Sequence, residues 1–184
     1  GDITYGDIIK VHPFGNEACL VEVTGQQIKD ALELGSAAYP GESGGFLQVS
    51  GLTYTINADI PSSVVKNDKS EFVKVDGAYR VSDIMVGGQP LDVSKTYTLA
   101  SHNYMLKSGG DGINMFMDNK VLQDEVMIDN QVLITYVRDS LKGVVGDAYA
   151  NPYGEGRITI TDMPYTDVHE GQFFYEPVKF VDGQ

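Results

Sequence analysis

The stretch "SHNYMLKSGGDGINMF", residues 101–116, places an aromatic ring and a carboxylate on the two sides of a glycine pair. Asn103 precedes Tyr104, and Asp111 follows the two glycines. Glycine adopts left-handed backbone conformations at little cost, so the chain can turn tightly here. The spacing leaves two interpretations open. One is a turn between two elements with nothing to bind. The other is a site where a flat ligand stacks on Tyr104 while Asp111 accepts hydrogen bonds from its hydroxyl groups.

The segment before this stretch predicts a turn, a strand and a helix in succession. Residues 13–16 (PFGN) favour a tight turn that holds Phe14 outside regular strand pairing. An apolar run that includes Cys19 follows and predicts a strand with a buried, inert thiol. Residues 24–39 predict a helix, because Thr24 and Gln27 have the spacing of a capping box and apolar or small residues recur every three to four positions.

Further elements are expected on both sides of the opening stretch. They are a strand over 44–56 with a bulge at Gly51, a hairpin over 78–93 that turns at residues 87–88, a strand over 96–106, a helix capped by Asp129 or Asn130 and ended by Gly143, and a short strand over 156–161. Strands dominate, and they do not alternate regularly with helices. We therefore predict an α+β (mixed α/β) fold with mixed sheets and flanking helices.

Composition excludes several classes of function. The chain of 184 residues has 26 acidic against 13 basic residues and a formal net charge of −13, without a Lys/Arg cluster, which argues against a nucleic acid duplex as partner. No apolar stretch approaches the roughly 20 residues of a membrane span. The acidic balance suits an exported protein.

Spacing alone identifies no catalytic residue and no cofactor site. The histidines at 12, 102 and 169 are far apart and form no metal-binding motif, and Cys19 is the only cysteine. Neither a nucleophile elbow nor a phosphate-binding P-loop is present, and the glycine-rich "SGGDG" lacks the lysine of a phosphate cradle. On these grounds alone Phe14 and Tyr104 are interpreted as core residues, with a pair of rings that clamp a flat base as the alternative.

The composition changes near residue 162. Residues 1–161 read as one domain, and residues 162–184 form a tail dense in aromatic and acidic residues with two prolines. The chain begins without an initiator methionine or a signal peptide, so we expect it to be a piece of a longer protein.

Three blocks of the sequence resemble, in order, a known family. They are "GDITYGDIIKVHPFGNEACLVEVTGQQIKDALE", "GGFLQVSGLTYT" and "YTLASHNYMLKSGGDGINMF", followed by "GEGRITI". Over roughly residues 1–161 the chain is similar to the C-terminal domain of the secreted and periplasmic 5′-nucleotidases. The resemblance implies an exported 5′-nucleotidase or 2′,3′-cyclic phosphodiesterase. In such a protein an N-terminal metallophosphoesterase domain with two divalent metal ions hydrolyses phosphate esters, and the C-terminal domain recognises the nucleotide.

The resemblance also implies a role for particular residues. Two aromatic rings of the family sandwich the nucleobase, and they fall on Phe14 and Tyr104. The family aspartate that binds the ribose hydroxyls falls on Asp111. The loop between them would be shaped by Asn103, Gly109 and Gly110.

Departures from the family pattern limit these expectations. Many members have phenylalanine at the position of Tyr104, so the hydroxyl can alter the choice of base. The family's Asn-Gly-Gly-x-Arg segment would precede Gly1, and the metal ligands of the enzyme are not in this chain. We therefore expect the chain alone to be inactive and to bind nucleotides more weakly than the complete protein.

The tail has a separate resemblance. "YTDVHEGQFFYEPVKFV", residues 165–181, is similar to the first line of an S-layer homology module, although Pro177 and the absence of the usual tryptophan depart from it. This resemblance implies attachment to cell-wall polysaccharide at a bacterial surface. The alternative for the tail is a flexible linker whose aromatic residues pack on the domain. For the chain as a whole, the alternatives to nucleotide recognition are a cell-surface interaction module without its own ligand and a domain that recognises a non-nucleotide phosphate ester.

Overall fold

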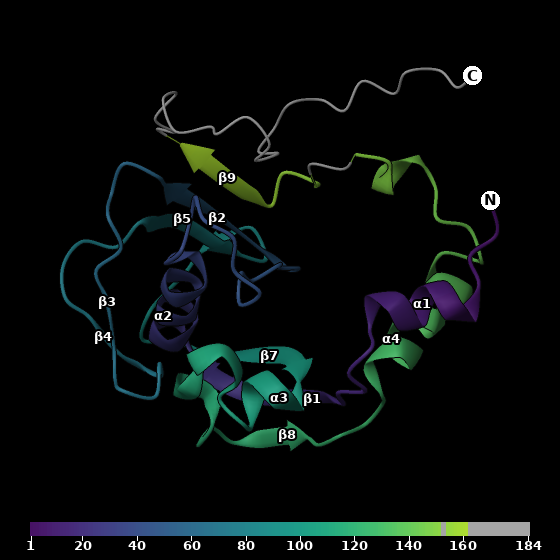
Figure 1. The fold of residues 1–184 in the computed structure, drawn as a ribbon, viewed down its shortest axis with the longest axis horizontal. Coiled ribbons are helices and arrows are strands. Elements are labelled where there is room, and N and C mark those ends of the chain that lie inside the picture. The colour runs from purple at the N-terminus through teal and green to yellow at the C-terminus, as the bar shows by residue number, and fades with distance from the viewer. Residues whose placement is uncertain (152–153, 162–184) are drawn as a thin grey trace.

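The computed structural model describes residues 1–151 and 154–161 of the chain, and the predicted tail module lies outside these residues. Among them the strands form three sheets (Figure 1). A three-stranded antiparallel sheet has the order β7 (Thr96–His102), β1 (Ala18–Thr24), β8 (Val121–Gln123). A four-stranded mixed sheet has the order β6 (Gln89–Pro90), β5 (Val81–Val86), β2 (Leu52–Asn57), β9 (Ile158–Thr161). A hairpin of β3 (Val64–Lys66) and β4 (Phe72–Val75) is the third.

Helices connect and cover these sheets. They are α1 (Tyr5–Val11), α2 (Gly25–Ser36), α3 (Asn103–Leu106) and α4 (Asp129–Thr135), with single 3₁₀ turns at Gly110–Gly112, Asn114–Phe116 and Asp147–Tyr149. Helix α2 lies between the two larger sheets, and α1 packs beside α4 near the N-terminus (Figure 1). The mixture of antiparallel and parallel pairing confirms the predicted α+β class.

Helix α2 forms as its sequence predicts. The side chain of Thr24 accepts a hydrogen bond from the N–H of Gln27, and the side chain of Gln27 accepts one from the N–H of Thr24. This reciprocal cap fixes the start of the helix. The predicted apolar stripe is buried, with Ile28, Ala31 and Leu32 each less than a tenth exposed, so α2 supplies one wall of the main core.

A buried carboxylate fastens α2 to the four-stranded sheet. Glu33 is fully buried, and its Oε2 accepts hydrogen bonds from the backbone N–H groups of Arg80 (2.9 Å) and Val81 (3.0 Å) at the start of β5. The guanidinium of Arg80, also buried, donates to the carbonyl groups of Ser36, the last residue of α2, and of Tyr39 beyond it. These bonds join two elements that are more than 40 residues apart in sequence.

The first part of the strand predicted over residues 44–56 is wrong. Only Leu52–Asn57 is β-strand, and Gly51, at φ 75°, precedes the strand instead of forming a bulge within it. Phe46 and Leu47 both pack against the core. Side chains of successive residues point to opposite faces of a pleated strand, so a strand here could not bury both on one side.

The strand predicted over residues 96–106 is right only to His102. There the imidazole Nδ1 accepts a hydrogen bond from the N–H of Met105 (3.2 Å) and caps the short helix α3. Histidine is an uncommon cap, and the periodicity of the strand gave no indication of it.

The helix predicted after Asp129 is present but is capped differently. Its N-cap is Ile128, whose hydrocarbon side chain cannot accept a hydrogen bond, and the Asp129 carboxylate accepts from the N–H groups of Asn16 and Asn130. The α-helix ends at Thr135 and continues as a π-helical turn over Tyr136–Ser140. Helix α1, which we did not predict, has a complete capping box between Thr4 and Asp7.

We expect the Glu33 contact to dominate the docking of α2. Replacing Glu33 by Ala removes the acceptor of two buried N–H groups and leaves a cavity, so the free energy of unfolding should fall by about 3 kcal/mol. Glu33→Gln retains one side-chain oxygen for those groups and should lose less than half as much. Urea denaturation of both variants measures the effect, with Glu42→Ala on an exposed loop as the control, expected within about 0.5 kcal/mol of wild type. Equal losses in the Ala variants at 33 and 42 would contradict this role.

Candidate nucleoside site

The glycine loop that follows Tyr104 has an unusual backbone. Gly109, Asp111 and Gly112 adopt positive φ angles of 65°, 56° and 81°. Aspartate is among the few non-glycine residues found in the left-handed region, and a residue held there is often part of a functional site. The Asp111 side chain is consequently directed away from the core and is exposed, while Gly110 is buried beneath it.

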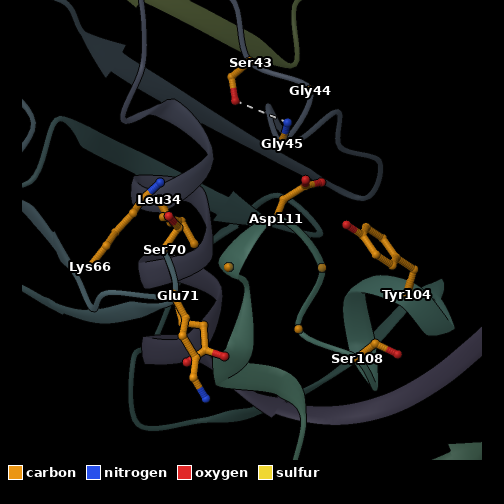
Figure 2. Close-up of a pocket in the computed structure, with 14 residues that line it drawn as sticks. Leu34, Ser43, Gly44, Gly45, Lys66, Ser70, Glu71, Tyr104, Ser108 and Asp111 are labelled. Carbon is orange, nitrogen blue, oxygen red and sulfur yellow. Dashed lines mark hydrogen bonds between the residues drawn. The ribbon is translucent and has the colours of Figure 1, made fainter.

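Close packing on both sides of Asp111 explains the two neighbouring glycines. A β-carbon on Gly110 would overlap the ring of Tyr104, and a β-carbon on Gly112 would overlap the carbonyl oxygen of Ser70 in the β3–β4 hairpin. Asp111 therefore lies between an aromatic ring on one side and the hairpin on the other. Figure 2 shows this arrangement, with Tyr104 on one side of Asp111 and Lys66 and Ser70 on the other.

Tyr104 is presented by α3 and is 46% exposed. Its ring lies beside the imidazole of His102, with centroids 6.1 Å apart and planes inclined at 30°. Since His102 also caps α3, the residue that starts the helix supports the ring that the helix displays. Tyr104 is thus a half-exposed ring in a defined position and not a core residue.

Asn103 connects this helix to the segment that carries Phe14. Its N–H donates to the carbonyl of Glu17 (2.8 Å), and its Oδ1 accepts from the N–H of Glu17 (3.1 Å). Phe14 is three residues before Glu17, and three residues span at most about 11 Å. The side chain of Phe14 is 83% exposed, so this ring is also outside the core, on a chain segment fastened next to Tyr104.

Charged groups hold the end of α3. The ammonium of Lys107 lies 2.8 Å from Asp124 Oδ1 and 3.0 Å from Glu125 Oε1. Its hydrogen bonds lower the pKa of both carboxyl groups, and the pair of carboxylates raises the pKa of Lys107 well above its usual range. Asp124 also accepts a bond from the buried thiol of Cys19, whose pKa is raised by burial, as expected for an inert cysteine.

A pocket of about 530 Å³ opens above the glycine loop (Figure 2). Three segments form its walls: the loop after Tyr104, the turn of the β3–β4 hairpin, and residues 43–45. Gly45 comes so close to Asp111 that a β-carbon there would lie 3.0 Å from the Asp111 Cβ. The residues that line the pocket are Leu34, Ser43, Gly44, Gly45, Lys66, Lys69, Ser70, Glu71, Tyr104, Ser108, Gly109, Gly110, Asp111 and Gly112.

The structure brings four of the six predicted residues together. Tyr104, Gly109, Gly110 and Asp111 line the pocket, whereas Phe14 and Asn103 do not. The hairpin residues were missed because no motif marks them and they are about 40 positions from Asp111 in the sequence. The sequence "NDKS" at 67–70 is a turn signal and gives no sign of what the turn covers.

The described residues contain neither a metal cluster nor a membrane-spanning helix. Within residues 1–151 and 154–161 no group of three or more His, Cys, Asp or Glu side chains is arranged to hold a metal ion. Over the same residues, no helix has both the length and the apolar character needed to cross a membrane.

Comparison with known proteins identifies the family. A family model described as "5′-nucleotidase, C-terminal domain" matches residues 1–118. The trifunctional nucleotide phosphoesterase protein YfkN of Bacillus subtilis is 29% identical over 185 residues, which cover 98% of this chain and 11% of that protein. The 5′-nucleotidase of Vibrio cholerae is 32% identical over 139 residues, covering 74% of this chain and 21% of that protein.

A solved structure agrees with this assignment. The crystal structure of the 5′-nucleotidase precursor from Thermus thermophilus superposes with a TM-score of 0.71 at 29% identity, covering 88% of this chain and 28% of that one. The chain belongs to the family of 5′-nucleotidase C-terminal domains. It spans only 11% to 28% of the length of these relatives.

The contact between Gly110 and Tyr104 can be tested directly. Gly110→Ala places a methyl group inside the Tyr104 ring, so either the ring or the loop must move. We expect a loss of about 1–3 kcal/mol in the free energy of unfolding and a change in the Tyr104 ring resonances. Gly146→Ala is the matched control, because its β-carbon would meet nothing within 4 Å and its φ is −92°. If Gly110→Ala behaved like Gly146→Ala in both measurements, the close packing described here would be incorrect.

Proposed function

We propose that this domain binds the nucleoside part of a nucleotide and presents its phosphate ester to a metallophosphoesterase domain of the same protein. Tyr104 and Phe14 stack the base from its two faces, and Asp111 accepts hydrogen bonds from the ribose hydroxyls. The observation that carries this proposal is the pocket in which a half-exposed aromatic ring and an exposed, left-handed aspartate stand side by side around Gly110.

The geometry suits each part of a nucleoside. A base is flat and stacks on an aromatic ring at about 1–3 kcal/mol per base. The sugar presents vicinal hydroxyls, which are donors that a carboxylate accepts well. Because Asp111 directly follows the glycine against which the Tyr104 ring packs, a base on that ring places its sugar near the carboxylate.

The chemistry of hydrolysis would be supplied elsewhere. We propose that two divalent metal ions are held by the metallophosphoesterase domain and that this chain alone is inactive. The parent protein would be exported and act outside a bacterial cell. The named relatives from Bacillus subtilis and Vibrio cholerae, a nucleotide phosphoesterase and a 5′-nucleotidase, support the substrate class.

The competing functions have less support. A surface module without a ligand would not need a ring and a carboxylate around one pocket, and the tail that suggested cell-wall polysaccharide lies outside the described residues. Attachment to the cell wall, and the domain boundary after residue 161, therefore stay as predictions from the sequence.

Removal of either ring should weaken nucleoside binding. Phe14→Ala and Tyr104→Ala each remove one stacking surface, so the dissociation constant of adenosine should rise by about 5- to 150-fold. Calorimetric or NMR titration measures this change, and Tyr5→Ala, which removes a 61% exposed ring on α1, is the control. Adenosine binding that was equally strong in all three variants would refute the stacking role.

The role of Asp111 separates hydroxyl recognition from base stacking. Asparagine also tolerates the left-handed region, so Asp111→Asn preserves the loop while it removes the charge. Wild-type protein should bind adenosine at least about tenfold more tightly than 2′,3′-dideoxyadenosine, and Asp111→Asn should lose most of that preference. A preference that survived the substitution would assign the hydroxyls to another residue.

A further inference from the structure

The β3–β4 hairpin brings two lysines to the pocket next to Asp111. Lys66 ends β3 and Lys69 belongs to the turn, and both are exposed and line the pocket. The chain has a net charge of −13, so basic side chains are few, and most of its lysines contact other groups of the protein.

The side chains of Lys66 and Lys69 have no hydrogen-bond, ion-pair or ring partner among the described residues, whereas the other lysines of that part of the chain do. Four of them contact carboxylates, namely Lys10, Lys74, Lys107 and Lys120. Lys29 and Lys95 lie over tyrosine rings, and Lys142 donates to a backbone carbonyl. Among the lysines of the described residues, the two without an internal partner are thus the two that border the candidate site.

The hairpin turn is pre-organised. The side chain of Asn67 accepts hydrogen bonds from the N–H groups of Lys69 (3.0 Å) and Glu71 (2.9 Å), and its amide donates to the Glu71 carboxylate (2.7 Å). Ser70 adopts a left-handed φ of 64° within this turn. The turn is therefore fixed before any ligand binds, which lowers the entropy cost of binding.

The hairpin is also fastened to the glycine loop. The carbonyl oxygen of Ser70 packs against Gly112, and the side-chain amide of Asn114 donates to the carbonyl of Phe72 (3.0 Å). Asp111 lies between these contacts and the Tyr104 ring, so the order across the pocket is ring, carboxylate, hairpin, and Figure 2 shows Lys66 on the side of Asp111 away from Tyr104. Lys69, from the turn of the same hairpin, also lines the pocket. The carboxylate of Glu71 is already engaged by Asn67.

The order of these groups across the pocket indicates how a nucleotide would be oriented in it. If the base lies on Tyr104 and a ribose hydroxyl bonds to Asp111, the 2′ and 3′ oxygens face the hairpin. The 5′ carbon is attached to C4′ and extends from the end of the sugar away from the base. We propose that Lys66 and Lys69 bind a phosphate group on the 2′ or 3′ oxygen, so that the domain favours nucleotides with a phosphate on that edge of the ribose. The remaining free hydroxyl still donates to Asp111. This inference rests on the proposed nucleoside site.

Two isomers of one nucleotide test the inference. Adenosine 3′-phosphate and adenosine 5′-phosphate carry the same charge, so a difference in affinity reports the position of the phosphate and not the overall field of the protein. At low ionic strength we expect the 3′ isomer to bind the wild-type chain about five- to tenfold more tightly than the 5′ isomer, with the difference reduced by added salt.

Variants assign the effect to the hairpin. In Lys66→Gln/Lys69→Gln the two isomers should bind equally, while adenosine binds as in wild type. Lys74→Gln, on the same hairpin but paired with Asp76 at 3.1 Å, should retain the preference. All substituted residues are exposed, and circular dichroism verifies that the fold is unchanged.

The outcomes distinguish the two proposals. If adenosine binds through Tyr104 but the isomers bind equally to wild type, the lysine inference is wrong and the nucleoside site stands. If the preference persists in the double variant, or is lost equally in Lys74→Gln, the assignment to Lys66 and Lys69 is also wrong. If the 3′ isomer binds through the lysines and Tyr104→Ala does not change its affinity, the nucleoside site is refuted. If none of the three compounds binds, both proposals are contradicted.

Discussion

The candidate site depends on one steric constraint, the contact between the backbone at Gly110 and the ring of Tyr104. Any other residue at position 110 would place a side chain where the ring lies. The contact fixes the ring relative to Asp111, which is the next residue along the chain. Gly112 provides the same kind of contact with the hairpin at Ser70. The carboxylate is consequently held between two packed surfaces, and its left-handed backbone turns it towards the open pocket.

The surrounding elements hold this loop in place on the sheet. Asn103 ties α3 to the beginning of β1 through two hydrogen bonds with Glu17, and Lys107 ties its end to the carboxylates that follow β8. The segment with Phe14 leads into the same strand β1. The positions of both rings are therefore set by one strand, the central strand of the three-stranded sheet. A recognition site needs such support, because stacking and hydroxyl contacts contribute only when their groups are held in place.

How far the sequence predicts this structure depends on whether the relevant signal is local. The capping box at Thr24, the burial of α2 and the hairpin that turns at residues 87–88 follow from short-range patterns, and they were predicted correctly. The segment before Leu52 and the cap at His102 were not, since tertiary packing decides the first and histidine rarely acts as a cap. Tyr104 and Asp111 belong to one short motif and could be selected from the sequence, whereas Lys66 and Lys69 belong to no motif and could not. Their place beside the pocket results from packing between Gly112 and Ser70, which no local pattern contains.

Intermolecular nuclear Overhauser effects between bound adenosine and the protein show directly whether the base lies between the two rings. The H2 and H8 protons of the base should show contacts to ring protons of both Phe14 and Tyr104, and the ribose protons should show contacts to the Asp111 methylene group. Contacts from the base to only one of the two rings, or to neither of them, would contradict the proposed sandwich.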